Sequence, residues 1–132
     1  MKNKTFIFFH LPALLTAVLI LIASTLPLSD TPFAVKVSDK TLHLIAYFGF
    51  SFLLARSFSN TKTLVLKDHF VILGSIAASL YGFFAESLQL LTPHRSFEVL
   101  DIAANTAGAL LGCGIYWLFS RTLSCSKPRL EN

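Results

Sequence analysis

Charge is scarce in this chain, and so are cysteine and tryptophan. Only 14% of the 132 residues are Asp, Glu, Lys or Arg, whereas 54% are hydrophobic and thirteen are Phe. A soluble domain of this length would expose too much apolar surface, so we expect the lipid bilayer to be its solvent. The two cysteines, Cys113 in an apolar stretch and Cys125 in a polar tail, exclude a disulfide framework. The length allows one domain over residues 1–132.

Long apolar runs take the place of the missing charge. A helix needs about 20 apolar residues to cross the hydrocarbon core, with a range of roughly 17–25. Four runs are long enough, namely residues 6–28, 42–58, 70–91 and 99–120. Pro12 and Pro27 lie near the ends of the first run and could kink or end its helix. The pattern predicts an all-α polytopic membrane protein, a bundle of four transmembrane helices.

Basic residues are distributed unevenly between these runs. The net charge of +4 is carried mostly by the chain ends and one loop, which indicates membrane orientation and not nucleic-acid binding. One side of the membrane would hold eight basic residues, namely Lys2, Lys4, Arg56, Lys62, Lys67, Arg121, Lys127 and Arg129. The other side would hold three, namely Lys36, Lys40 and Arg95. Because cytoplasmic loops carry the excess, we expect both termini in the cytoplasm.

The first run also has features of a signal peptide. Lys2 and Lys4 precede it, and residues 22–24 could form a cleavage site. The apolar residues continue to Leu28, however, without a clear small-x-small site. We therefore expect the first helix to be retained.

Polar residues form narrow stripes on three of the expected helices. The stripes are Asp39, Lys40, His43 and Tyr47 on the second helix, Glu86 and Gln89 on the third, and Asp101, Asn105, Gly108 and Gly112 on the fourth. A charged side chain at mid-bilayer costs roughly 2.5–3.5 kcal/mol on insertion scales. We therefore expect the stripes to face one another. Since each acid lies near the outer end of its helix, they would form a shallow well open to the outer leaflet.

Several of these residues also have a simpler interpretation. Asp39 could cap its helix, and Asp101 could only complement a helix dipole. Arg95 could neutralise an acid, or it could hold a phosphate or carboxylate. The G-x-x-x-G pair of Gly108 and Gly112 indicates close helix packing.

Three motifs connect these residues to a known family. They are D-K-x-x-H-x-x-x-Y at 39–47, E-x-x-Q-x-x-x-P-x-R at 86–95 and D-x-x-x-N-x-x-G at 101–108. Over residues 39–112 the chain resembles the VanZ-like family of small bacterial integral membrane proteins. The resemblance implies the bacterial cytoplasmic (inner) membrane, these site residues and a cell-envelope role such as teicoplanin resistance. It implies no particular reaction.

The first functional hypothesis is a binding site at the outer leaflet. Its candidate residues are Asp39, Lys40, His43, Glu86, Gln89, Arg95, Asp101 and Asn105. Lys40, Arg95 and the outward helix N-termini could hold a lipid-linked phosphate or a peptidoglycan stem-peptide carboxylate. The three acids oppose such an anion.

Two alternatives remain open at the level of the sequence. In an intramembrane enzyme acting on a lipid-linked or envelope phosphate, Glu86 would be the catalytic base, with His43 or Asp101 moving or orienting the proton. The carboxylates and the histidine could instead hold a divalent cation that assists the reaction. No serine or cysteine nucleophile has a recognisable arrangement, and no ligand spacing is diagnostic of a metal, so we assign no cofactor. In a structural protein, the polar groups would only hold the helices together. The sequence does not decide the oligomeric state.

Overall fold

The computed structural model describes residues 2–25, 39–91 and 97–125. These residues form helices and turns, and no strand occurs among them. The helices are α1 (Lys2–Thr5), the π-helix η1 (Phe6–His10), α2 (Leu11–Thr25), α3 (Asp39–Ser59), α4 (Leu64–Asp68), α5 (Phe70–Gln89) and α6 (Val99–Cys125). The predicted all-α class is confirmed.

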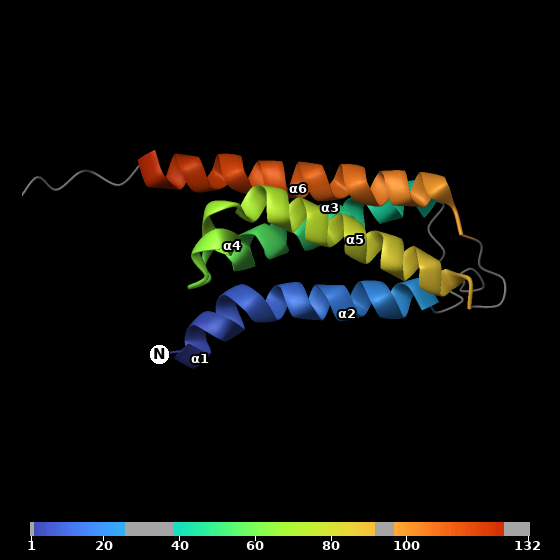
Figure 1. The fold of residues 1–132 in the computed structure, drawn as a ribbon, viewed down its shortest axis with the longest axis horizontal. Helices are drawn as coiled ribbons and strands as arrows, with labels where there is room; N and C mark the ends of the chain where they lie inside the picture. Colours follow the sequence, from blue (N-terminus) through green and yellow to red (C-terminus); the bar gives the residue numbers. More distant parts are fainter. Residues whose placement is uncertain (1, 26–38, 92–96, 126–132) are drawn as a thin grey trace, which may run out of the picture.

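Four of these segments are long and apolar enough to cross a membrane. They are Phe6–Thr25, Asp39–Ser59, Phe70–Gln89 and Val99–Leu123, with mean hydropathy between 1.3 and 2.5. They run alternately up and down, so that α1, α4 and the end of α6 lie at one end of the bundle (Figure 1). Large apolar side chains such as Leu19, Leu80 and Leu118 are exposed on the outer surface, where lipid is their natural solvent.

The first span changes its winding at a proline. Pro12 has no N–H to donate to the carbonyl of Phe8, and its ring would crowd that carbonyl. The chain is wound as a π-helix immediately before it, and the Leu11 N–H donates to the Phe6 carbonyl. The perturbation expected at Pro12 is therefore a local widening of the helix, from α-helix to π-helix, in the turn before the proline. Pro27 lies outside the described residues.

The helices differ from the predicted runs mainly at their ends. α3 begins at Asp39 instead of residue 42, because its polar first turn packs toward α6 and needs no lipid-compatible side chains. α6 extends past residue 120, where Arg121 stacks over the Trp117 ring at 4.3 Å. α5 ends at Gln89, and the next N–H groups, those of Leu90 and Leu91, bond to carbonyls three residues back.

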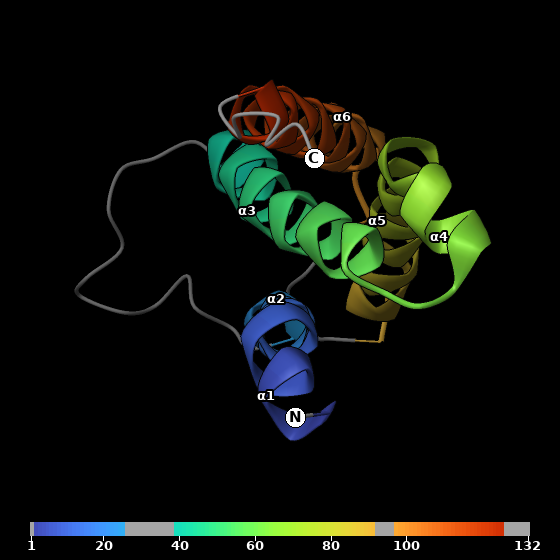
Figure 2. The ribbon, with the colours of Figure 1, turned by 90° about the vertical axis from the view of Figure 1, so that its left-hand side faces the viewer.

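The helix pair α3 and α6 forms the centre of the bundle. α5 packs against both, whereas α2 contacts α3 and α5 on the side away from α6 (Figure 2). A Cβ at Gly108 would overlap the Leu44 carbonyl oxygen, and one at Gly112 would overlap that of Phe48. The two backbones approach this closely because both positions lack a side chain.

Two small apolar clusters fill the space between the helices. One is formed by Tyr47, Phe50, Ala78 and Ala109, and the other by Ala55, Cys113 and Tyr116. Both include residues of α3 and α6, so the central pair is held along most of its length. This packing fixes the relative position of the helix ends that carry the polar residues.

Candidate functional site

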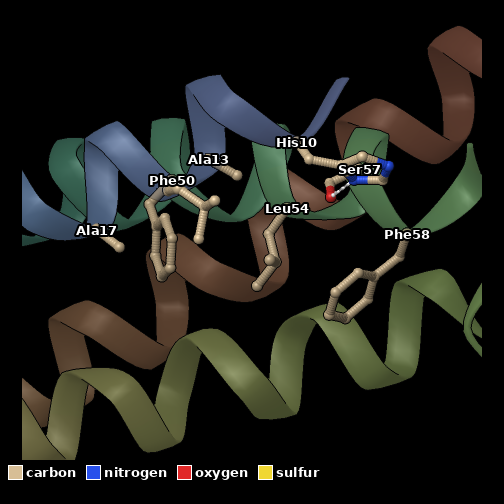
Figure 3. A pocket seen from close by; sticks show the side chains of 8 residues that line it. His10, Ala13, Ala17, Phe50, Leu54, Ser57 and Phe58 are labelled. Carbon is tan, nitrogen blue, oxygen red and sulfur yellow. Dashed lines mark hydrogen bonds between the residues drawn. The ribbon is translucent and has the colours of Figure 1, made fainter. Parts of the chain in front are cut away.

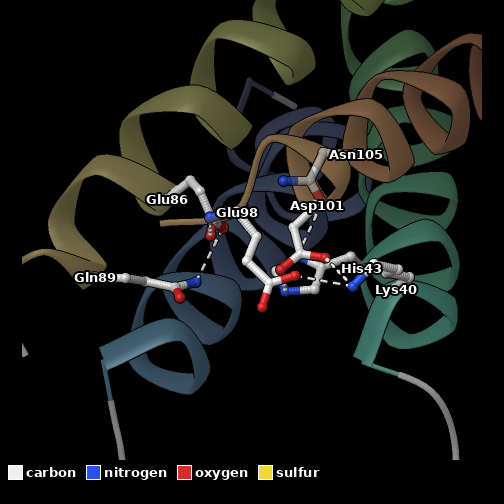
Figure 4. Close-up of polar contacts among 7 residues, drawn as sticks. All are labelled: Lys40, His43, Glu86, Gln89, Glu98, Asp101 and Asn105. Carbon is white, nitrogen blue, oxygen red and sulfur yellow. Dashed lines mark hydrogen bonds and ion pairs between the residues drawn. The ribbon is translucent and has the colours of Figure 1, made fainter. Parts of the chain in front are cut away.

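Polar side chains from three helices meet at one end of the bundle. The start of α3, the end of α5 and the start of α6 lie together there (Figure 4). We call the following residues the polar network: Lys40, His43, Glu86, Gln89, Glu98, Asp101 and Asn105. Four of them, Glu86, Gln89, Asp101 and Asn105, are at most 3% exposed.

On the α5 side, the network is centred on the Glu86 carboxylate. Gln89 lies three residues further along α5, and its side-chain N–H donates to Glu86 Oε2 at 3.0 Å. The backbone N–H of Glu98 donates to Glu86 Oε1 at 3.2 Å. Each carboxylate oxygen therefore has a donor, which offsets part of the cost of burying the group.

On the other side, the network joins α3 to α6 through an imidazole. His43 Nδ1 lies 3.0 Å from Asn105 Oδ1. A carbonyl oxygen can only accept, so the hydrogen bond places the proton on His43 Nδ1. The second ring nitrogen, Nε2, then faces Asp101 Oδ2 at 3.9 Å. This separation is too long for a direct hydrogen bond.

Lys40 is engaged by two acids of the α6 segment. Its Nζ donates to Glu98 Oε2 at 2.9 Å and lies 3.8 Å from Asp101 Oδ1. The hydrogen bond and the charge of Lys40 lower the pKa of the exposed Glu98 carboxyl below its ordinary value. Lys40 is thus occupied by Glu98, and an anionic ligand would have to displace that carboxylate.

Several buried polar atoms have no hydrogen-bond partner among the described residues. Within the network these are Asp101 Oδ1 and Asn105 Nδ2, and the Tyr47 hydroxyl is a third such group. Buried polar groups are nearly always paired, with protein, water or a ligand. These atoms are therefore the places where the network can accept an additional molecule or ion.

The predicted site residues are mostly brought together. Asp39 lies beside His43 and Asp101 at the start of α3, and Tyr47 is buried one helical turn beyond His43. Pro93 and Arg95, which end the motif E-x-x-Q-x-x-x-P-x-R, lie outside the described residues.

Sequence reasoning missed Glu98 as a member of the site. It contributes a backbone N–H to Glu86 and a carboxylate to Lys40. Glu98 lies just before α6 and outside the apolar run, at a position where an acidic residue is typical of a surface loop. Its spacing of three from Asp101 was the available signal, because residues three apart share a helix face.

A second concave region has a different character. A cleft of about 290 Å³ lies between the first span and α3, lined by His10, Ala13, Leu14, Ala17, Phe50, Leu54, Ser57 and Phe58 (Figure 3). Two of its lining residues, His10 and Ser57, are joined by a hydrogen bond between His10 Nδ1 and Ser57 Oγ at 2.6 Å. Ser57 is near the end of α3, whereas His43 is near its start, so the cleft is separate from the polar network.

The bundle and the network together define a polytopic all-α membrane protein with a polar site at one end of its helices. A model of the family described as VanZ/LLP1 matches residues 7–120. The chain therefore belongs to the VanZ/LLP1 family, which confirms the resemblance drawn from the three motifs. No curated protein and no solved structure matches the chain.

Proposed function

We propose that this protein binds the polar head group of a cell-envelope component at the outer leaflet of the bacterial cytoplasmic membrane. One observation carries the proposal: buried polar residues of three helices converge at one end of an otherwise apolar bundle. Ionisable residues within spans are rare, costly and usually functional. Packing alone would not need them, because interhelical polar contacts contribute only about 0.6 kcal/mol on average.

The charge of the network favours a particular kind of ligand. Asp39, Glu86, Glu98 and Asp101 supply carboxylates, whereas Lys40 is the basic residue placed among them in the described part of the chain. A ligand that carries an amine or donates hydrogen bonds suits these acceptors better than an anion does. The amine of a lipid head group or of a peptidoglycan stem peptide has this chemistry.

The proposed orientation rests on the basic residues of the sequence. An excess of Lys and Arg at the end opposite the network favours cytoplasmic termini. Single cysteines at Leu91 and at Lys62, in a chain with Cys113 and Cys125 replaced by Ser, test this in spheroplasts. An impermeant thiol reagent should label the first before lysis and the second only after it. The reverse pattern would overturn the orientation.

The function is tested by separating loss of fold from loss of activity. Glu86→Gln, His43→Ala, Arg95→Ala and Asp101→Asn are scored for folded yield in detergent and for teicoplanin sensitivity in cells lacking the native copy. Asp68→Asn and His69→Ala are matched controls, because both residues are exposed around α4 at the other end of the bundle. Variants at these four positions that fold but lose the phenotype support the proposal. Variants that lose folded protein and phenotype together would make the network purely structural.

A further inference from the structure

Two side chains of the polar network, together with the adjacent Asp39, have the types and spacing of metal ligands. Asp39, His43 and Asp101 each present one ligand atom, and these atoms lie within 4.8 Å of one another. Two ligands bound to the same Zn²⁺ at about 2.0–2.2 Å lie roughly 3–4 Å apart. Small side-chain rotations would therefore bring all three onto one ion.

The hydrogen bond from His43 to Asn105 prepares the imidazole for this role. Because Nδ1 carries the proton, Nε2 of the neutral ring has a free lone pair, and it faces Asp101 Oδ2 at 3.9 Å. Metal-binding histidines commonly donate their other N–H to a carbonyl or carboxylate, which orients the ring and fixes this tautomer.

A second observation points to a ligand at the same place. Asp101 is only 3% exposed, and its Oδ1 has no hydrogen-bond partner. Lys40 Nζ forms an ion pair with this oxygen at 3.8 Å, too long for a hydrogen bond, because it donates to Glu98 at 2.9 Å. A buried carboxylate needs compensation by a partner, and a cation is the strongest available.

We propose that Asp39, His43 and Asp101 bind one divalent transition-metal ion, with Zn²⁺ as the natural occupant. The imidazole favours Zn²⁺ over Ca²⁺, Mg²⁺ and Mn²⁺, which prefer oxygen ligands. Asp39 is exposed, so the ion is reached from the open end of the bundle and keeps coordination positions for water. Asn105 is a positioning residue that acts through His43.

An ion at this place would occupy Asp39 and Asp101, two of the four carboxylates counted above as acceptors. The test uses metal alone, so that its failure is distinguishable from failure of the proposed function. The full chain is purified in detergent, stripped with a chelator and titrated with Zn²⁺ against a chromophoric competitor. We expect one saturable Zn²⁺ per chain, and X-ray absorption of the loaded protein should show one imidazole with oxygen ligands. Absence of saturable binding, or a spectrum without imidazole, would overturn the site.

Variants identify the residues that hold the ion. His43→Gln and Asp101→Asn should weaken Zn²⁺ binding at least about tenfold, and Asn105→Ala should weaken it about 10–100-fold while one ion still binds. Asp68→Asn is the matched control, because it neutralises an exposed acid at the other end of the bundle; its Zn²⁺ affinity should equal that of the native protein. Unchanged affinity in both His43→Gln and Asp101→Asn would refute the assignment.

Discussion

The backbone N–H of Glu98 donates to Glu86 Oε1 at 3.2 Å, so the carboxylate of one helix meets the beginning of the next. Free N–H groups and the helix dipole make a helix N-terminus a favourable place for an anion. Glu86 therefore stabilises the start of α6 from the end of α5. This bond joins the end of α5 to the start of α6 directly, in addition to the covalent chain between them.

Removal of the Glu86 carboxylate should destabilise the fold. In Glu86→Ala, the donors of Gln89 and Glu98 lose their acceptor, and the expected cost is about 1–3 kcal/mol in free energy of unfolding. Glu86→Gln keeps one acceptor oxygen and should cost less than about 1 kcal/mol. Unfolding by SDS in mixed micelles measures both. Equal stability of the alanine variant and the native protein would contradict the role given to these hydrogen bonds.

The close approach of α3 and α6 should depend on two glycines. Gly108→Ala and Gly112→Ala place a methyl group against backbone oxygens of α3, which cannot move aside as a side chain can. Each should cost roughly 1–3 kcal/mol, as overpacking does. Gly114 is the matched control, since a Cβ there meets nothing within 4 Å. Gly114→Ala should be neutral or gain up to about 1 kcal/mol from helix propensity. The SDS unfolding midpoint of each variant, compared with that of the native protein, tests this prediction.

The ion pair between Lys40 and Glu98 should be visible as a pH effect. Hydrogen bonding and charge from Lys40 lower the pKa of Glu98 below its ordinary value of 4.5. The pair therefore stabilises the fold fully above that value, and the contribution disappears as the pH falls through the lowered pKa. Lys40→Met should raise the pKa of Glu98, measured by carboxyl ¹³C NMR in detergent. Lys67→Met, at the other end of the bundle, should leave it unchanged.

Two tyrosine hydroxyls should respond differently to removal. The Tyr47 hydroxyl is buried without a partner among the described residues, so Tyr47→Phe should unfold at the same SDS fraction or a higher one. The Tyr81 hydroxyl donates to the Ala17 carbonyl at 2.6 Å, so Tyr81→Phe should cost about 0.6 kcal/mol. If Tyr47→Phe proves clearly less stable, its hydroxyl has a bonded water or ligand in the native protein.

The sequence predicts the bundle well because a hydrocarbon solvent leaves few options. Apolar runs of spanning length must be helical, and the cost of exposing Asp101 or Glu86 to lipid directs both inward. Individual partners are harder to predict. The bond from Glu98 to Glu86 depends on where a connecting loop ends, and the bond from His43 to Asn105 depends on the rotation of two helices. Periodicity gives the face of a helix but not its partner.

The first span is attached to the rest of the protein mainly by apolar contacts, together with the hydrogen bonds between His10 and Ser57 and from Tyr81 to the Ala17 carbonyl. Only 6% of its 18-residue apolar window is buried, and none of its described residues belongs to the polar network. Selection on this helix therefore acts mainly on length and hydrophobicity, whereas α3, α5 and α6 are constrained side chain by side chain. Over evolutionary time, the N-terminal helix should accept substitutions freely while the other three keep their motifs.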